Sequence, residues 1–241
     1  MKGNDIIRVP LTDAELEKLS ASEAHCMKLS EDESRRLRAI NTKRLEENKR
    51  KRVEWRKAEE PLAAELRSSG FEVNSAWDLF SNNEPWIKKK KIRAYTRALP
   101  ILLRHIELPY PDAVREGIAR ALSEKRGSFE EAGLDPDLVW RKIVNLFAKE
   151  PNGTRAKMGL AVALSAMSDK RTLNEIIQLC KDRTNGEDRI ILLSVLERSG
   201  EASAEAALRD LETDPELMME ISEIRKRQAR REKRRQSQKK H

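Results

Sequence analysis

The sequence predicts an all-α protein, and three observations support that class. Charged residues make up 37% of the chain and aromatic residues only 4%, a balance that favours helices over a β-sandwich or barrel. Apolar residues in the denser stretches recur at three- and four-residue steps, which is the spacing of one helix face. The stretch VREGIARALS at 114–123 returns as AKMGLAVALS at 156–165, which indicates a helical repeat.

The N-terminal segment, 1–60, is expected to be helical and highly charged. Thr12 and Glu15 make a capping box, in which a hydroxyl and a carboxylate each satisfy a free N–H at a helix start, and Ser30 and Glu33 make a second box. The stretch that follows is rich in helix-forming residues, but its apolar positions are too sparse for a coiled coil. We therefore expect a solvated arm over 1–60, which is a candidate for partner binding.

Residues 61–222 are expected to form a domain of paired helices. Pro61 should start or kink the first helix and Gly70 should end it, because Gly tolerates a positive φ. Pro100 should bend the next long helix, at 86–106. The later helices are expected at 112–123, 138–149, 156–167, 172–181, 189–196 and 203–212, with a small added helix from Ser128 and an N-cap at Asp214.

Two glycines recur at the same position of the repeat. Gly117 and Gly159 both fall inside predicted helices, where Gly costs about 1 kcal/mol relative to Ala. Their recurrence therefore indicates that two helices approach each other closely at this position.

The chain resembles the HEAT-repeat family over roughly residues 86–222. The resemblance rests on ALPILLRHIELPYPDAVREGIARALS and its two weaker copies, a degenerate motif that indicates architecture more than function. It implies an α-α superhelix of stacked helix pairs, and Pro100 matches the family's bend in the first helix of a pair.

The resemblance also implies a ladder of basic residues that stack between repeats. Arg115, Lys157 and Arg189 stand at the matching positions, and the interval from Lys157 to Arg189 is short for this family. The turn acid of the family is missing six residues earlier, where this chain has two prolines and Arg183.

Most of the net positive charge lies in the C-terminal segment. The stretch 225–241 contains ten Lys or Arg and one Glu, a net charge of +9, and because the whole chain carries +8 the part before it sums to −1. Residues 223–241 are expected to be a disordered basic tail, because such charge density opposes folding. The candidate contacts in it are Arg225, Lys226, Arg227, Arg230, Arg231, Lys233, Arg234 and Arg235.

A second basic feature is a stripe on the helix predicted at 86–106. Lys89, Arg93 and Arg97 recur every four residues, and Arg104 lies close to the same line. This pattern is either an ordinary solvated helix face or a track for phosphate groups.

Several classes of site are not indicated. The histidines and cysteines lack metal-ligand spacing, and the glycines do not cluster into a phosphate loop, so no cofactor or metal is expected. The apolar runs are too short to span a membrane, and the start of the chain lacks the apolar core of a signal peptide. We therefore expect a cytoplasmic protein without a membrane contact.

The expected function is a non-enzymatic protein-interaction module or scaffold, because stacked helix pairs give a long binding surface without a deep pocket. The alternative is a nucleic-acid-binding helical-repeat protein, with weak and non-specific contacts through the tail. A HEAT-like DNA glycosylase is less favoured. Trp86 or Trp140 beside Asp137 and Arg141 are its candidates for a cleft, and none of that family's catalytic residues matches this sequence.

Overall fold

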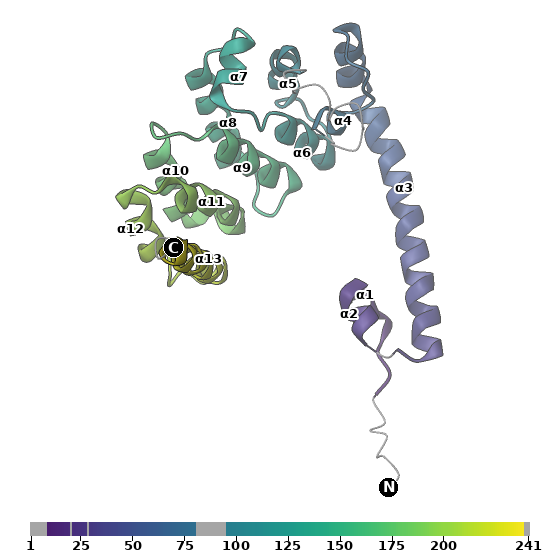
Figure 1. Ribbon diagram of the computed structural model, residues 1–241. Coiled ribbons are helices and arrows are strands. Elements are labelled where there is room, and N and C mark those ends of the chain that lie inside the picture. Colours follow the sequence, from purple (N-terminus) through teal and green to yellow (C-terminus); the bar gives the residue numbers. More distant parts are fainter. Residues whose placement is uncertain (1–8, 20, 28, 81–94, 239–241) are drawn as a thin grey trace. The chain divides into compact units, whose positions relative to one another are not determined.

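The computed structural model describes residues 9–19, 21–27, 29–80 and 95–238 (Figure 1). Over these ranges the chain forms helices and turns and contains no β-strand, so the all-α class is confirmed. The chain divides into two compact units, Met1–Trp55 and Arg56–His241. The division falls slightly before the expected boundary at 60, and none separates the C-terminal segment from the helical body.

The first unit contains two short helices and the N-terminal part of one long helix. Both predicted capping boxes are formed: Thr12 N donates to Glu15 over 2.8 Å, and Ser30 N donates to Glu33 over 2.8 Å. Glu33 also accepts from Leu11 N over 2.7 Å, which ties the start of the unit to the long helix. The helices are α1 (Asp13–Lys18), α2 (Ala21–Cys26) and the first part of α3 (Glu31–Ser68).

Pro61 lies inside α3 and does not begin a new helix, so the expectation of a start there is wrong. Its ring is on the exposed side of the helix, whereas Leu62, Ala63 and Leu66 are fully buried. Burial of this apolar side explains why the helix continues past the proline. Gly70 ends the segment with a φ of 88°, as predicted.

The second unit follows the predicted order of helices. Residues 86–94 lie outside the described residues, and α5 begins at Leu99 with Pro100 in its first turn, so Pro100 starts this helix instead of bending it. After α3, the elements are α4 (Trp77–Phe80), η1 (Thr96–Ala98), α5 (Leu99–His105), α6 (Asp112–Ala121), α7 (Arg126–Glu131), α8 (Pro136–Lys149), α9 (Arg155–Met167), α10 (Leu173–Lys181), η2 (Arg183–Asp188), α11 (Arg189–Ser199), α12 (Ala202–Asp210) and α13 (Met218–Gln238).

The helices α6, α9 and α11 pack side by side in this order, and α13 packs on α11 (Figure 1). Behind them α8 packs on α9, and α10 and α12 pack on α11. Leu192, Val195 and Leu196 of the third copy are buried, so this copy packs directly on the second despite the short interval. None of the helices in the described ranges is both long and apolar enough to cross a membrane.

The two repeated glycines lie at close contacts, as predicted. A Cβ at Gly159 would be 2.9 Å from the Cβ of Ala119 and 3.0 Å from the backbone oxygen of Glu116, so the absence of a side chain lets α6 and α9 approach. A Cβ at Gly117 would be 2.5 Å from Nε1 of Trp77. Each glycine thus makes room for a neighbour that a larger residue would displace.

The C-terminal segment is ordered over most of its length, and the expectation of disorder is wrong for residues 223–238. They belong to α13, a helix of 21 residues. Two causes act together: the segment contains helix-forming Glu, Lys, Arg and Gln with no Gly or Pro, and the start of the helix is buried against the body.

Candidate functional site

The candidate site lies on α13 and begins with the way this helix is anchored. Leu217, Ile221 and Ile224 are at most 1% exposed, and they recur on one side of the first turns, where α13 contacts α11. Asp214 lies in the turn before the helix, where its carboxylate accepts from Glu216 N over 3.0 Å; α13 itself begins at Met218, so the expected N-cap at Asp214 is not formed. The first half of α13 is therefore fixed to the body.

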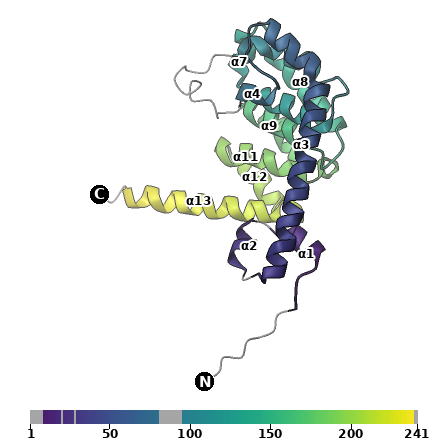
Figure 2. The same cartoon turned by 90° about the vertical axis from the view of Figure 1, so that its right-hand side faces the viewer.

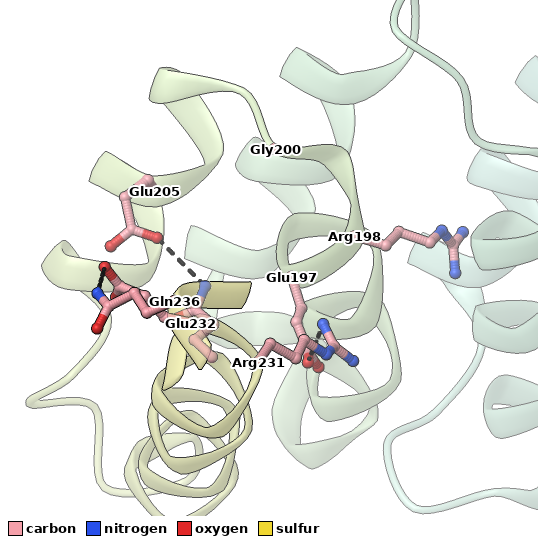
Figure 3. Close-up of a pocket in the computed structure, with 8 residues that line it drawn as sticks. Glu197, Arg198, Gly200, Glu205, Arg231, Glu232 and Gln236 are labelled. Atoms are coloured by element: carbon pink, nitrogen blue, oxygen red, sulfur yellow. Dashed lines mark hydrogen bonds and ion pairs between the residues drawn. The ribbon is translucent and has the colours of Figure 1, made fainter. Parts of the chain in front are cut away.

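Ion pairs hold the middle of α13. Arg225 donates to Glu205 of α12 over 2.6 Å, and both Arg227 and Arg231 reach Glu197 of α11, over 2.8 and 3.1 Å. Figure 3 shows the carboxylate of Glu197 beside the guanidinium of Arg231. The hydrogen bond from Arg227 holds the pKa of Glu197 below its ordinary value, so this carboxylate is charged at neutral pH.

Beyond its anchor, α13 presents a basic face. A helix turns by about 100° per residue, which places a run of Lys and Arg within one half of the circumference and places Gln228, Glu232 and Gln236 opposite. All members of the run are exposed except Arg227, which is half-buried. We define the basic face of α13 as Lys226, Arg227, Arg230, Arg231, Lys233 and Arg234.

Part of this face has no internal partner. Arg230, Lys233 and Arg234 form no ion pair with any other side chain in the described part of the chain. Because no described carboxylate lies within ion-pair distance of them, these exposed cations can bind an anion. The side chain of Arg235, which was also predicted as a contact, lies outside the described residues.

A groove of about 840 Å³ lies beside α13, between this helix and the ends of α11 and α12, and it reaches Arg231 at the edge of the basic face (Figure 3). Its carboxylates Glu197 and Glu205 are paired with the arginines of α13. The side chain of Arg198 points away from α13 and donates to Ser168 Oγ over 3.0 Å. The residues that line the groove are Glu197, Arg198, Gly200, Glu205, Gln228, Arg231, Glu232 and Gln236.

This lining contains no His, Cys or Ser and no pair of a nucleophile with a base. No group of three His, Cys, Asp or Glu that could hold a metal was found in the described ranges. The groove therefore offers hydrogen bonds and charge to a bound molecule.

The predicted stripe on 86–106 is not assembled as a site. Lys89 and Arg93 lie outside the described residues. Arg97 stacks over the ring of Phe71, with 5.9 Å between its Cζ and the ring centroid, and Arg104 pairs with Glu65. The two described members thus have internal partners.

The predicted ladder residues are structural. Arg115 pairs with Glu150, which starts the turn after α8. Lys157 is 1% exposed, and its ammonium donates to Asn152 Oδ1 over 2.6 Å and to the backbone oxygen of Glu150 over 3.1 Å. Burial lowers the pKa of Lys157. Both residues tie a helix of the inner row to the turn that precedes α9.

Arg189 is the most enclosed of the three. It is 0% exposed, and it donates to the backbone oxygens of Gly186 and Cys180 over 2.8 and 3.0 Å. It also pairs with Asp214 over 3.0 Å, and this hydrogen bond lowers the pKa of the carboxyl. Glu150 lies 35 residues after its partner Arg115, and Asp214 lies 25 residues after its partner Arg189. A search for an acid six residues before each basic residue therefore misses both.

The residues considered for a glycosylase cleft do not form one. Trp140 is 2% exposed, and its Nε1 donates to Glu175 over 2.8 Å. Asp137 pairs with Arg126, and Arg141 donates to the backbone oxygen of Asp137 over 3.3 Å. Trp86 lies outside the described residues. The tryptophan on α8 is therefore a packing residue.

Comparisons with protein-family models, with curated proteins and with solved structures found no match to this chain.

Proposed function

We propose that this protein is a non-enzymatic binding module in which HEAT-like helix pairs form a scaffold and the basic face of α13 binds the phosphate backbone of nucleic acid. The observation that carries the proposal is the sorting of charge on α13. Six Lys and Arg side chains share one face, and three of them have no ion pair within the described ranges.

The arrangement of the inner helices supports a HEAT-like scaffold. The row α6, α9, α11 and the helices packed behind it give the neighbour-to-neighbour contacts of a repeat stack. The ladder residues Arg115, Lys157 and Arg189 connect the inner row to its turns. Within the described ranges α13 packs on α11 and follows the row α6, α9, α11.

The chemistry of the face supports a phosphate ligand. Lys and Arg bind phosphate oxygens through charge-assisted hydrogen bonds, and each phosphate neutralised on a duplex releases counterions. From Lys226 to Arg234 the helix rises by about 12 Å, because each residue adds about 1.5 Å. This length covers several consecutive phosphates of a nucleic acid.

The test replaces the three unpaired cations. The variant Arg230→Gln/Lys233→Gln/Arg234→Gln keeps Arg225, Arg227 and Arg231 in their ion pairs, so the anchor of α13 is preserved. We expect the affinity of the full chain for a fluorescein-labelled 20-bp DNA duplex, measured by fluorescence anisotropy at low salt, to fall at least about tenfold.

The matched control is Lys43→Gln/Arg50→Gln/Arg52→Gln on α3. These side chains are exposed, and the change removes the same charge from a helix that carries its basic residues on all sides. Equal losses in the two variants would show that net charge and not the α13 face governs binding, and would contradict the proposal. Unchanged affinity in the α13 variant would contradict it as well.

A protein partner on the helical body is the second candidate function, and the groove beside α13 favours it. The lining combines carboxylates, guanidinium groups and the amides of Gln228 and Gln236, which suits the mixed polar groups of a peptide. A crosslinker placed at Gln236 should then capture a protein from cells even after nuclease treatment. Capture that disappears after nuclease treatment would contradict a direct protein partner and would support only the nucleic-acid role.

A further inference from the structure

We infer that the ligand of the basic face of α13 is duplex DNA in the B form. This inference rests on the proposed function and specifies which nucleic acid the face accepts. Three features of α13 carry it: its exposed C-terminal half, the arrangement of its cations in two rows, and the absence of aromatic residues from its sequence.

The C-terminal half of α13 is exposed from Ala229 to Arg234, although one side of it faces the groove, where Arg231 pairs with Glu197. Figure 2 shows α13 extending beyond α11 and α12 as a single rod. From Ala229 to Arg234 every side chain is exposed, and the hydrogen bonds of Gln236 and Ser237 are made within the helix. A ligand can therefore reach the side of this half that carries Arg230, Lys233 and Arg234 without displacing another element of its unit.

The dimensions of a free helix discriminate between duplexes. An α-helix with its side chains is about 10–12 Å across, and the major groove of B-form DNA is about 12 Å wide. The major groove of an A-form RNA duplex is too deep and narrow for such contacts. A rod of this kind fits a DNA duplex and not an RNA duplex.

The cations form two rows that match two strands. Lys226, Arg230 and Lys233 lie along one line of the helix. The second line contains Arg227, Arg231 and Arg234, and it is turned by about 100° from the first. A helix in a groove faces phosphates on both sides, so each row can contact the phosphates of one strand.

A single strand offers less to this helix. Proteins that bind single-stranded nucleic acid combine cations with aromatic side chains on which bases stack. Met218–Gln238 contains no Phe, Tyr or Trp. A single strand also has a lower charge density, which weakens the gain from counterion release. Cations alone therefore favour the duplex.

The experiment compares three probes of one sequence: a 20-bp DNA duplex, one of its strands, and the corresponding RNA duplex. Affinity of the full chain is measured by fluorescence anisotropy at two salt concentrations, together with the Arg230→Gln/Lys233→Gln/Arg234→Gln variant and the Lys43→Gln/Arg50→Gln/Arg52→Gln control. We expect the DNA duplex to bind at least about fivefold more tightly than either other probe, and the α13 variant to lose this preference.

Three results would overturn the inference in distinguishable ways. If the single strand or the RNA duplex binds as tightly as the DNA duplex and binding still needs the α13 cations, the face binds phosphate but the ligand class is wrong. If none of the probes binds, the proposed function fails together with the inference. A preference for the DNA duplex that persists in the α13 variant would place the duplex site elsewhere on the chain and would also contradict the inference.

Discussion

The ladder and the basic face of α13 are both rows of basic residues in the same unit, yet their side chains have opposite environments. Arg189 is 0% exposed, and backbone oxygens and the Asp214 carboxylate accept its hydrogen bonds. Arg230 and Arg234 are exposed and have no ion pair among the described side chains. The difference teaches that the fold decides which basic residues are enclosed by acceptors and which stay exposed to a ligand.

The largest expected effect comes from breaking the ladder. Arg189→Met should lower the free energy of unfolding by about 3–5 kcal/mol, because it removes the buried cation that pairs with Asp214 and leaves only the exposed Arg183 near that carboxylate. Urea denaturation followed by circular dichroism measures this change. The matched control, Arg230→Met, makes the same replacement on the exposed face and should stay within about 0.5 kcal/mol of the parent.

A loss below about 1 kcal/mol in Arg189→Met would contradict the structural role of the ladder. Arg183, whose Nε lies 3.4 Å from the Asp214 carboxylate, would then be the cation that stabilises this acid.

Glu59 is a buried acid that forms no ion pair with the described side chains, and it extends the comparison from buried cations to a buried carboxyl group. Burial raises the pKa of Glu59 from its ordinary value of 4.5 to about 7, while Ala76 N donates to it over 2.6 Å. The folded protein thus holds this proton to higher pH than the unfolded chain. The free energy of unfolding should therefore fall as pH rises from 4.5 through about 7.

Glu59→Gln keeps an oxygen that accepts from Ala76 and removes the titration. Because one pKa unit corresponds to about 1.4 kcal/mol, the variant should be more stable than the parent by about 1–3 kcal/mol at pH 8 and nearly equal at pH 4. Denaturation at both pH values tests this. A gain of equal size at both would show that packing, and not the proton, causes it.

The smallest effect on stability is expected at Glu197, a carboxylate of the body that pairs with two arginines of the basic face. Its partners Arg227 and Arg231 are 38% and 60% exposed, so Glu197→Gln should change the free energy of unfolding by less than about 1 kcal/mol. The variant also removes the ion pair of Arg231 with Glu197 and one of the two ion pairs of Arg227, which keeps Glu220, so affinity for duplex DNA should rise. A fall in affinity would mean that Glu197 orients these arginines for the ligand.

The sequence predicts most of the fold because the helix period is local. The repeated Gly117 and Gly159 indicate close packing, and the structure places both at contacts that a side chain would obstruct. The ladder positions Arg115, Lys157 and Arg189 follow from the repeat. Their acid partners do not, because Glu150 and Asp214 are brought to them by tertiary packing.

The sequence predicts which residues of the candidate site are basic, but it does not predict how they are arranged on a helix. The sequence identifies the basic residues of 225–235, but their high charge also suggests disorder. The apolar anchor of Ile221 and Ile224 and the carboxylates of Glu197 and Glu205 convert this segment into a helix with one basic face. These acids come from other helices, so no local sequence pattern indicates them.

The salt dependence of DNA binding tests the central claim most directly. For each phosphate neutralised on a duplex, the slope of log K against log salt steepens by about 0.9. If about five cations of the face contact phosphate, the full chain should give a slope near −4 to −5. Removing Arg230, Lys233 and Arg234 should reduce its magnitude by about 2–3, whereas the α3 control should leave it unchanged. An α13 variant whose slope equals that of the parent would show that these residues do not contact phosphate and would contradict the account.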